Sequence, residues 1–244
     1  MLETWLLPVL ILVAALLYSS VGHAGASGYL AAMALFGLAP AEMRPAALLL
    51  NVIVATIGTI KYSRAGHFSR RLFFLFTLGS IPCALLGGYL TLPSTVYRPV
   101  VGAILLLSSV RLMIESPKLV AADKKRVPVL VAVVCGGAIG LLSGLTGTGG
   151  GIFLSPLLLF MRWAETKETA GVSVAFILAN SIAGLVGLLS KAPTLPQGIG
   201  VWAVAATLGG LIGSEFGSKR LGNFTLRKLL ALVLVIAGLK MILS

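Results

Sequence analysis

Charged residues are scarce in this chain of 244 residues: Lys, Arg, Asp and Glu make up 11% of it, whereas 58% of it is hydrophobic. Only 7 residues are acidic, and the mean hydropathy is +1.04. Soluble domains carry about 25% charged residues, so this composition excludes a soluble domain. It predicts an all-α, polytopic membrane protein that forms a single membrane domain over residues 1–244.

Cysteine and histidine are also scarce, with 2 residues of each. Cys83 and Cys135 lie far apart in apolar segments, and we expect both to be buried free thiols. Two distant cysteines supply no metal-ligand spacing, so we expect no metal site. We also expect no cofactor.

Positive charge, in contrast, is in excess: 19 Lys and Arg residues give a formal net charge of +12. In a soluble protein this excess would suggest a nucleic-acid partner. Here the basic residues fall in short loops between apolar segments, which is the positive-inside pattern of membrane proteins. We therefore expect a multi-pass protein of the cell inner (plasma) membrane, with the lipid bilayer and no nucleic acid as its partner.

The apolar residues form ten segments, most of them suited to a spanning helix of about 20 residues. Two segments, 28–39 and 152–162, are too short to span alone, and both follow a glycine-rich break. The remaining segments cover about 5–21, 44–61, 72–91, 98–115, 127–145, 169–189, 198–217 and 226–243.

The segments repeat as two homologous halves, about 1–118 and 127–244. Each half begins with a long segment, a break and a short segment, and three long segments follow. Residues also match at a constant spacing: Ser19, Gly25, Phe36 and Ala46 precede Ser143, Gly149, Phe160 and Ala170 by the same number of positions. This agreement predicts an internal duplication.

The distribution of Lys and Arg distinguishes inverted from parallel halves. If each broken pair, 5–39 and 127–162, forms a re-entrant hairpin, the second half is inverted. Only four of the 19 basic residues then fall outside the cell: Arg44, Arg98, Lys191 and Lys240. If the broken pairs cross fully, the loops 162–168 and 218–228 move outside with their basic residues. The inverted arrangement fits better, and it places both termini outside.

The stretch Ser143–Pro156 holds the densest glycine cluster of the chain, inside an apolar run. Irregular backbone at membrane depth is tolerated only where protein buries it or a watery cavity faces it. A break followed by a new helix leaves free N–H groups and a positive dipole end, which suits an anion. We therefore predict substrate-binding residues at Thr146, Gly147, Thr148, Gly149, Gly150 and Gly151. Tight helix packing is the alternative for glycine-rich sequence, and we assign the isolated glycines of 209–217 to it.

The first half has a less glycine-dense break at Ser19–Gly28. We predict Gly22, His23, Gly25 and Ser27 as its substrate-binding residues. His23 could donate to an anion or carry a proton, or it could be a neutral histidine bonded to local backbone. His67 lies in a basic loop and is expected to be solvated.

Asn51 and Asn180 lie near the middle of the segments that follow the two breaks. A lone amide there either faces a substrate path or joins two helices. We include both in the predicted site, together with Ser173. Ser173 and Ser181 are the weaker candidates, because serine can bond to its own helix.

These motifs resemble the TauE/SafE family of bacterial anion permeases. The resemblance rests on Gly147–Gly151 with Pro156, on Glu168–Ser173, and on the closing segments Gly209–Gly217 and Arg227–Lys240. It implies a transporter that exports sulfite, thiosulfate, organosulfonates or related anions, with alternating access between its halves. The first break departs from the family's denser glycine run.

Other functions stay open at this point. Gly25–Gly28 spells Gly-x-Ser-Gly, the nucleophile pattern of rhomboid-type intramembrane proteases, in which Ser27 would need a histidine base. A passive anion channel would use the same glycine-lined site. A transporter of cations or neutral solutes on the same plan is disfavoured by the lack of midplane acids. A homodimer is left open as the assembly.

Overall fold

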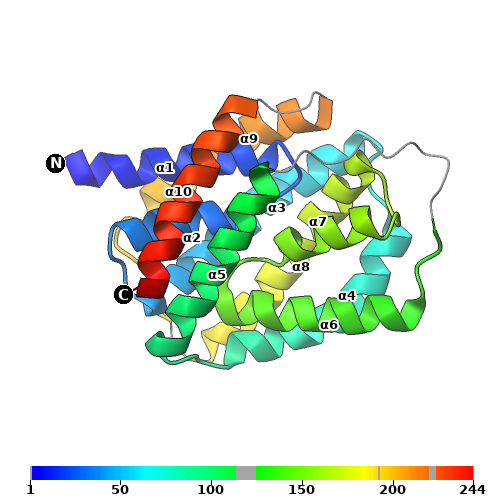
Figure 1. Cartoon of the computed structure of the whole chain (residues 1–244), viewed down its shortest axis with the longest axis horizontal. Helices are drawn as coiled ribbons and strands as arrows, with labels where there is room; N and C mark the ends of the chain where they lie inside the picture. The colour runs from blue at the N-terminus through cyan, green and yellow to red at the C-terminus, as the bar shows by residue number, and fades with distance from the viewer. Residues whose placement is uncertain (1, 114–124, 192, 220–223, 244) are drawn as a thin grey trace.

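A computed structural model describes residues 2–113, 125–191, 193–219 and 224–243 (Figure 1). These residues form ten α-helices and no strand, so the protein is all-α. The helices are α1 (Leu2–Ser19), α2 (Ala26–Leu35), α3 (Pro40–Arg64), α4 (Arg70–Tyr89), α5 (Ser94–Met113), α6 (Val129–Thr146), α7 (Gly151–Phe160), α8 (Thr166–Leu189), α9 (Ile199–Lys219) and α10 (Phe224–Leu243). Most of the junction between the two predicted halves lies outside the described residues.

The helices follow the ten predicted segments, including the two short ones, which become the 10-residue helices α2 and α7. Among the described residues, five helices are long and apolar enough to cross a membrane: α3, α4, α6, α8 and α9. Large apolar side chains such as Phe74, Leu130 and Phe160 are exposed on the outer faces of their helices. A soluble protein would bury such faces, so the exposed apolar surface indicates contact with lipid.

Glycines on α6 set how closely it packs against α4. A Cβ placed on Gly136, Gly140 or Gly144 would lie 2.2 Å from a carbonyl oxygen of α4 in each case. Those oxygens belong to Phe76, Ser80 and Ala84. The two series advance together, four residues at a time, so α4 and α6 run parallel in backbone contact. Close approach through small residues is the usual basis of helix association in membranes.

The pair α1 and α9 repeats this arrangement. Gly209 and Gly213 on α9 face carbonyl oxygens of α1, and Gly217 faces that of the next residue, at 2.1–2.3 Å from where a Cβ would lie. The oxygens belong to Leu12, Leu16 and Ser20, in the same order along the chain. α1 and α9 therefore also run parallel, and the assignment of these glycines to helix packing is confirmed.

Two further pairs run antiparallel. A Cβ on Gly58 of α3 would lie 2.7 Å from Val174 of α8, whereas one on Gly184 would lie 3.5 Å from Leu48. α5 and α10 pack in the same sense, because Gly102 faces Gly238 and Ile242 while Gly238 also faces Leu106 of α5. Each pair joins one helix from each half of the chain.

The halves interlock, because each long helix that precedes a break packs on the other half. α1 lies along α9, and α6 lies along α4 at one edge of the molecule, while α5 and α10 are side by side (Figure 1). α3 and α8 also contact each other extensively. In addition, each of them packs on a helix of the other half: α3 packs on α9, and α8 packs on α4. Exchanging α1–α5 with α6–α10 leaves this set of main contacts unchanged.

We predict that Gly140→Ala lowers the free energy of unfolding by about 1–3 kcal/mol, because its methyl group would force α4 and α6 apart. Gly200→Ala is the matched control, since Gly200 is also helical but has nothing within 4 Å of a Cβ. Thermal unfolding of the purified protein in detergent measures both. Equal midpoints for the two variants would contradict this account of the α4–α6 contact.

Candidate functional site at the two helix breaks

The second break is built by glycines in the left-handed region of backbone space. α6 ends at Thr146, and Gly147, Gly149 and Gly150 follow with φ of 84°, 78° and 80°. A side chain at any of these positions would be strained, so glycine is what allows the chain to turn here. Gly150 is the N-cap of α7.

The start of α7 presents open hydrogen-bond donors. The first amides of any helix lack partners within that helix, and here the amides of Phe153 and Leu154 are the first to bond back, both to the Gly150 carbonyl. Those of Gly149, Gly150 and Gly151 have no partner among the described residues. The break therefore combines unpaired N–H groups with the positive end of the α7 dipole.

Asn51 and Asn180 both lie against this break. Nδ2 of Asn51 lies 2.8 Å from where a Cβ on Gly149 would be, and Nδ2 of Asn180 lies 3.4 Å from that of Gly150. Both asparagines are fully buried, in the middle of α3 and α8 respectively. The break therefore sits at mid-depth of the two long helices that pack across the molecule.

Each asparagine has one polar atom engaged and one open. The Ser80 hydroxyl donates to Oδ1 of Asn180 at 2.7 Å, whereas Nδ2 of Asn180 has no partner among the described residues. Asn51 donates from Nδ2 to Ser181 at 3.3 Å, and its Oδ1 is open in the same sense. An open polar atom at this depth costs free energy, so these atoms mark where a ligand could bond. Ser80 was not among the predicted residues.

The two threonines of the break are engaged with their own segment. The Thr146 hydroxyl donates to the Leu142 carbonyl at 2.6 Å and lies 3.0 Å from the Thr148 hydroxyl. The Tyr97 hydroxyl of α5 donates to the Thr146 carbonyl at 3.1 Å. These bonds hold the end of α6 in place beside the glycines.

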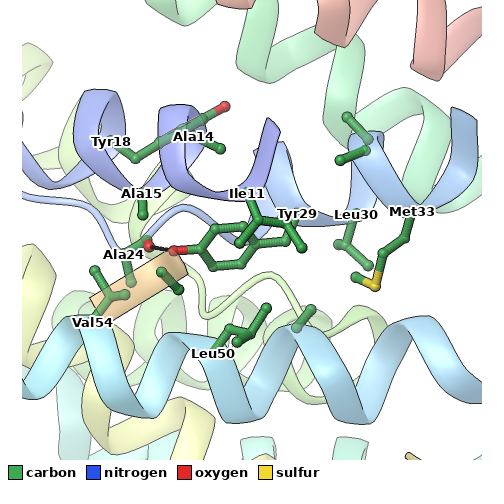
Figure 2. Close-up of a cluster of buried hydrophobic side chains, with 14 of the residues drawn as sticks. Ile11, Ala14, Ala15, Tyr18, Ala24, Tyr29, Leu30, Met33, Leu50 and Val54 are labelled. Carbon is green, nitrogen blue, oxygen red and sulfur yellow. Dashed lines mark hydrogen bonds between the residues drawn. The ribbon is translucent and has the colours of Figure 1, made fainter. Parts of the chain in front are cut away.

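In the first break, a tyrosine of α2 bonds to a backbone carbonyl of the break itself. Gly22 and Gly25 have φ of 79° and 109°, and α2 begins directly after Gly25. Figure 2 shows Tyr29 reaching back from α2, where its hydroxyl donates to the Ala24 carbonyl at 2.5 Å. Its ring lies 2.6 Å from where a Cβ on Gly25 would be. Gly22 in turn packs against Ala170 of α8.

The His23 side chain connects the first break to the helix that follows the second. Its Nε2 lies 3.2 Å from the Ser155 hydroxyl on α7, which lies 2.8 Å from the Ser173 hydroxyl on α8. Its Cδ2 lies 3.3 Å from where a Cβ on Gly151 would be. The two breaks therefore meet, as the duplicated sequence suggested. Ser155 lies in the glycine-rich stretch but was not singled out, because a serine inside an apolar helix gives no signal of its own.

The Ser27 side chain is not directed toward the start of α7. Its hydroxyl lies 3.1 Å from the Ser108 hydroxyl of α5, whereas the His23 ring bonds toward Ser155. Ser27 and Ser108 are both buried. Of the predicted polar residues, His23, Ser173, Asn51 and Asn180 therefore gather around the start of α7, and Ser27 does not.

Arg44 corrects the sequence interpretation, which placed it in an outside loop. It lies in the first turns of α3 and is buried, with bonds from its guanidinium to four carbonyl oxygens. Nε donates to Gly144 at 2.9 Å, and Nη1 and Nη2 donate to Leu90, Gly87 and Gly88 at 2.8, 2.5 and 2.7 Å. These are end carbonyls of α4 and α6, which lack partners within their helices. Composition does not distinguish a buried capping arginine from a loop arginine.

No group of three His, Cys, Asp or Glu side chains within the described residues could hold a metal ion. Cys83 and Cys135 are free thiols. Both are half-buried, whereas the sequence predicted buried thiols. They lie on α4 and α6, whose outer faces carry exposed apolar side chains.

Comparisons with known proteins identify the family of this chain. The sequence model of the family described as "Sulfite exporter TauE/SafE" matches residues 7–241. The chain belongs to the TauE/SafE family. A "Probable membrane transporter protein y4hK" from Sinorhizobium fredii is 39% identical over 97% of both chains. A "Probable membrane transporter protein" from Xylella fastidiosa is 32% identical over 46% of this chain and 43% of its own. No solved structure matches the chain.

Membership of the TauE/SafE family makes the chain a multi-pass membrane transporter and not an enzyme. The intramembrane-protease interpretation of Ser27 is therefore wrong, and the geometry gives the reason. A serine nucleophile needs a base within hydrogen-bond reach, and the partner of Ser27 is another serine.

We predict that Arg44→Met destabilises this TauE/SafE protein by about 3 kcal/mol, because it leaves end carbonyls of α4 and α6 buried without donors. Lys191→Met is the control: Lys191 is exposed near the same end of α4, with its Nζ 4.5 Å from the Tyr89 ring centroid. Thermal unfolding in detergent should show a clear loss for Arg44→Met only. A loss of the same size in the control would refute the capping role.

Proposed function

We propose that this TauE/SafE protein is a carrier that exports small sulfur-containing anions such as sulfite, thiosulfate or organosulfonates. The observation that carries the proposal is the convergence of donors at the start of α7. The open amides of Gly149–Gly151 and Nδ2 of Asn180 gather there. The description of the family as sulfite exporters supports the chemical class of the substrate.

The charge around this site favours an anion over a cation. α7 contains no ionisable residue, and the acidic residues of α3 and α8, Glu42 and Glu168, lie in their first turns. The asparagines that flank the break are mid-helix. The nearest fixed electrostatic feature is the positive end of the α7 dipole. A bound cation would meet that end without a compensating carboxylate.

We also infer that the two halves are inverted repeats. Counterpart helices run antiparallel where they meet, α3 against α8 and α5 against α10. The main contacts are preserved when the halves are exchanged. Inverted repeats with broken helices, and a substrate site where they meet, are the plan of many secondary transporters. Rocking of one half against the other would open the buried cluster to either side in turn.

Inverted repeats imply a membrane topology. In it, the two broken pairs are re-entrant hairpins, both termini lie outside the cell and the loop 162–168 lies in the cytoplasm. Loss of an anion from a negative interior is favoured by about 2.3 kcal/mol at 100 mV for each net negative charge that crosses, which supports export for substrates that cross with a net negative charge.

The topology is tested by cysteine labelling in a variant without Cys83 and Cys135. We expect Lys167→Cys to react with a membrane-impermeant maleimide only in inside-out vesicles, and Gln197→Cys only in intact cells. Both side chains are exposed, so access to the thiol does not limit labelling. Parallel halves would give the reverse pattern.

The site is tested by binding of sulfite, thiosulfate and methanesulfonate to purified protein. We predict that Gly150→Ala lowers affinity at least tenfold, because it strains a backbone of φ 80° and its methyl group would press on Ile139 and Phe176. Gly66→Ala is the matched control, since Gly66 has φ of 78° but nothing within 4 Å of a Cβ. It carries the same backbone strain away from the break.

Binding that Gly150→Ala does not change, in a protein as stable as Gly66→Ala, would move the site away from the second break. Carrier and channel are then separated in liposomes. A carrier shows saturable uptake that is accelerated by substrate on the other side, whereas a channel does not.

A further inference from the structure

We propose that His23 binds one proton together with the anion, so that the protein carries anion and proton across the membrane as a pair. This inference rests on the proposed anion site and names its coupling ion. It follows from where His23 lies, from the hydrogen bonds of its two ring nitrogens, and from the electrostatics at the start of α7.

The His23 ring lies beside the first turn of α7. Cδ2 lies 3.3 Å from where a Cβ on Gly151 would be, and Nε2 lies 3.2 Å from the Ser155 hydroxyl. An anion held by the open amides of Gly149–Gly151 would therefore bind next to the ring. The imidazole is almost fully buried, so a charge on it would meet little water.

The ring nitrogens have distinct partners. Nδ1 lies 3.3 Å from the Val21 carbonyl, which can only accept, so the neutral ring carries its hydrogen on Nδ1. Nε2 then accepts from Ser155, and the Ser173 hydroxyl donates to Ser155 in turn. A proton that arrives at Nε2 reverses this chain: Nε2 donates to Ser155, and Ser155 donates to Ser173. Serine hydroxyls rotate freely enough to serve both states.

Anion and proton each favour the binding of the other. Without an anion, an imidazolium at the positive end of α7 would face an unfavourable dipole in a medium that screens poorly. With an anion on the α7 amides, the same imidazolium gains an opposite charge next to it. Such a coupling is reciprocal by thermodynamic linkage, so the anion also binds more tightly when His23 is protonated.

Few other ionisable groups face His23 from the elements packed around it. α1 contributes Tyr18, whose ring centroid is 6.3 Å from that of His23. α2 contributes Tyr29, which donates to Ala24, and α7 contributes none. α8 contributes Lys167 and Glu168, both in its first turn. α3 contributes Tyr62, whose hydroxyl lies 3.2 Å from the Ser19 and Ser20 carbonyls at the first break. Among the described residues near the break, His23 is therefore the group whose charge changes most readily near neutral pH.

His67, the other histidine, lies in the loop between α3 and α4, outside the membrane-spanning segments. Partial burial and the positive charge of Lys167 lower the pKa of His67. Its ring is therefore neutral at pH 7 and distant in sequence from the break. It provides a matched control for substitution of a histidine.

Co-transport of a proton fixes how the membrane potential acts. A monoanion and a proton cross with no net charge, so the potential does not drive them, and their combined concentration gradient alone sets whether they are exported. A dianion and a proton carry one negative charge outward, so the potential still favours export of the dianion. The proton enters Nε2 from water on the side where the anion binds and returns to water on the side where the anion leaves.

Proton uptake during binding is the decisive measurement. Methanesulfonate is the probe, because its sulfonate stays singly charged at every pH used. It is added to purified protein in weakly buffered detergent with a pH indicator, at about one pH unit above the ordinary histidine pKa of about 6.5. We expect uptake of about one proton per bound anion in the wild type and in His67→Gln, and none in His23→Gln.

The outcomes separate this inference from the function on which it rests. Wild-type protein that binds methanesulfonate without proton uptake overturns the inference alone, and this holds even if His23→Gln does not fold. Proton uptake that persists in His23→Gln also overturns it. Failure to bind methanesulfonate, sulfite and thiosulfate overturns the proposed function and the inference together.

Transport gives an independent readout in proteoliposomes clamped at zero voltage. An acid exterior one pH unit below the lumen should concentrate methanesulfonate inside about tenfold in wild type and in His67→Gln, the ratio set by one proton per anion. His23→Gln should reach only equal concentrations. Accumulation by wild type that ignores the pH gradient would overturn the coupling.

Discussion

The requirement that every backbone N–H and C=O find a partner at membrane depth governs this structure. Two helix breaks violate it, and the surrounding side chains restore it in most places. Arg44 supplies donors to end carbonyls of α4 and α6, and Tyr62 points its hydroxyl at the last carbonyls of α1, Ser19 and Ser20. Tyr29 bonds to the Ala24 carbonyl in the first break. The first amides of α2 and of α7 are left over, and those of α7 lie beside the open side-chain nitrogen of Asn180, where bonding capacity is free for a substrate.

The two breaks also differ in the side chains around them, which supports unequal roles for the two copies in the proposed site. At the constant spacing that relates the halves, Tyr29 corresponds to Phe153 and His23 corresponds to Gly147. The first break thus has a tyrosine that bonds to its own carbonyl, where the second has a phenylalanine that cannot. The first break also contains His23, whose side chain contacts α7. At the corresponding position the second break has Gly147, with φ of 84°. One copy supplies the open donors, and the other supplies the side chain that faces them.

Sequence reasoning was strongest where a single physical scale decides the outcome. Segment lengths, the two short helices and the packing role of Gly209–Gly217 follow from bilayer thickness and from the size of glycine. It also placed Asn51 and Asn180 beside a break, where the structure has them, because an amide in mid-helix is costly unless it is used. It missed Ser155 and misplaced Arg44, because a partner chosen across the fold leaves no mark on the local pattern. The nearest partners of both residues are more than ten positions away in the chain.

The glycine-lined contacts also bear on how the halves could move. At the glycines of α4–α6 and α1–α9 the backbones lie in direct contact, so each broken helix is held tightly to the opposite half. If these pairs move as rigid bodies, α6 and the second break move with α3–α5, whereas α1 and the first break move with α8–α10. The two bodies would then move relative to each other where α7, His23 and α8 meet. That junction combines apolar packing of α7 on α8 with two hydroxyls and one imidazole, whose hydrogen bonds can be exchanged for others at little cost. A binding event that changes the charge on this imidazole would therefore act at the contact among α7, His23 and α8, which has to rearrange when the site switches its access from one side of the membrane to the other.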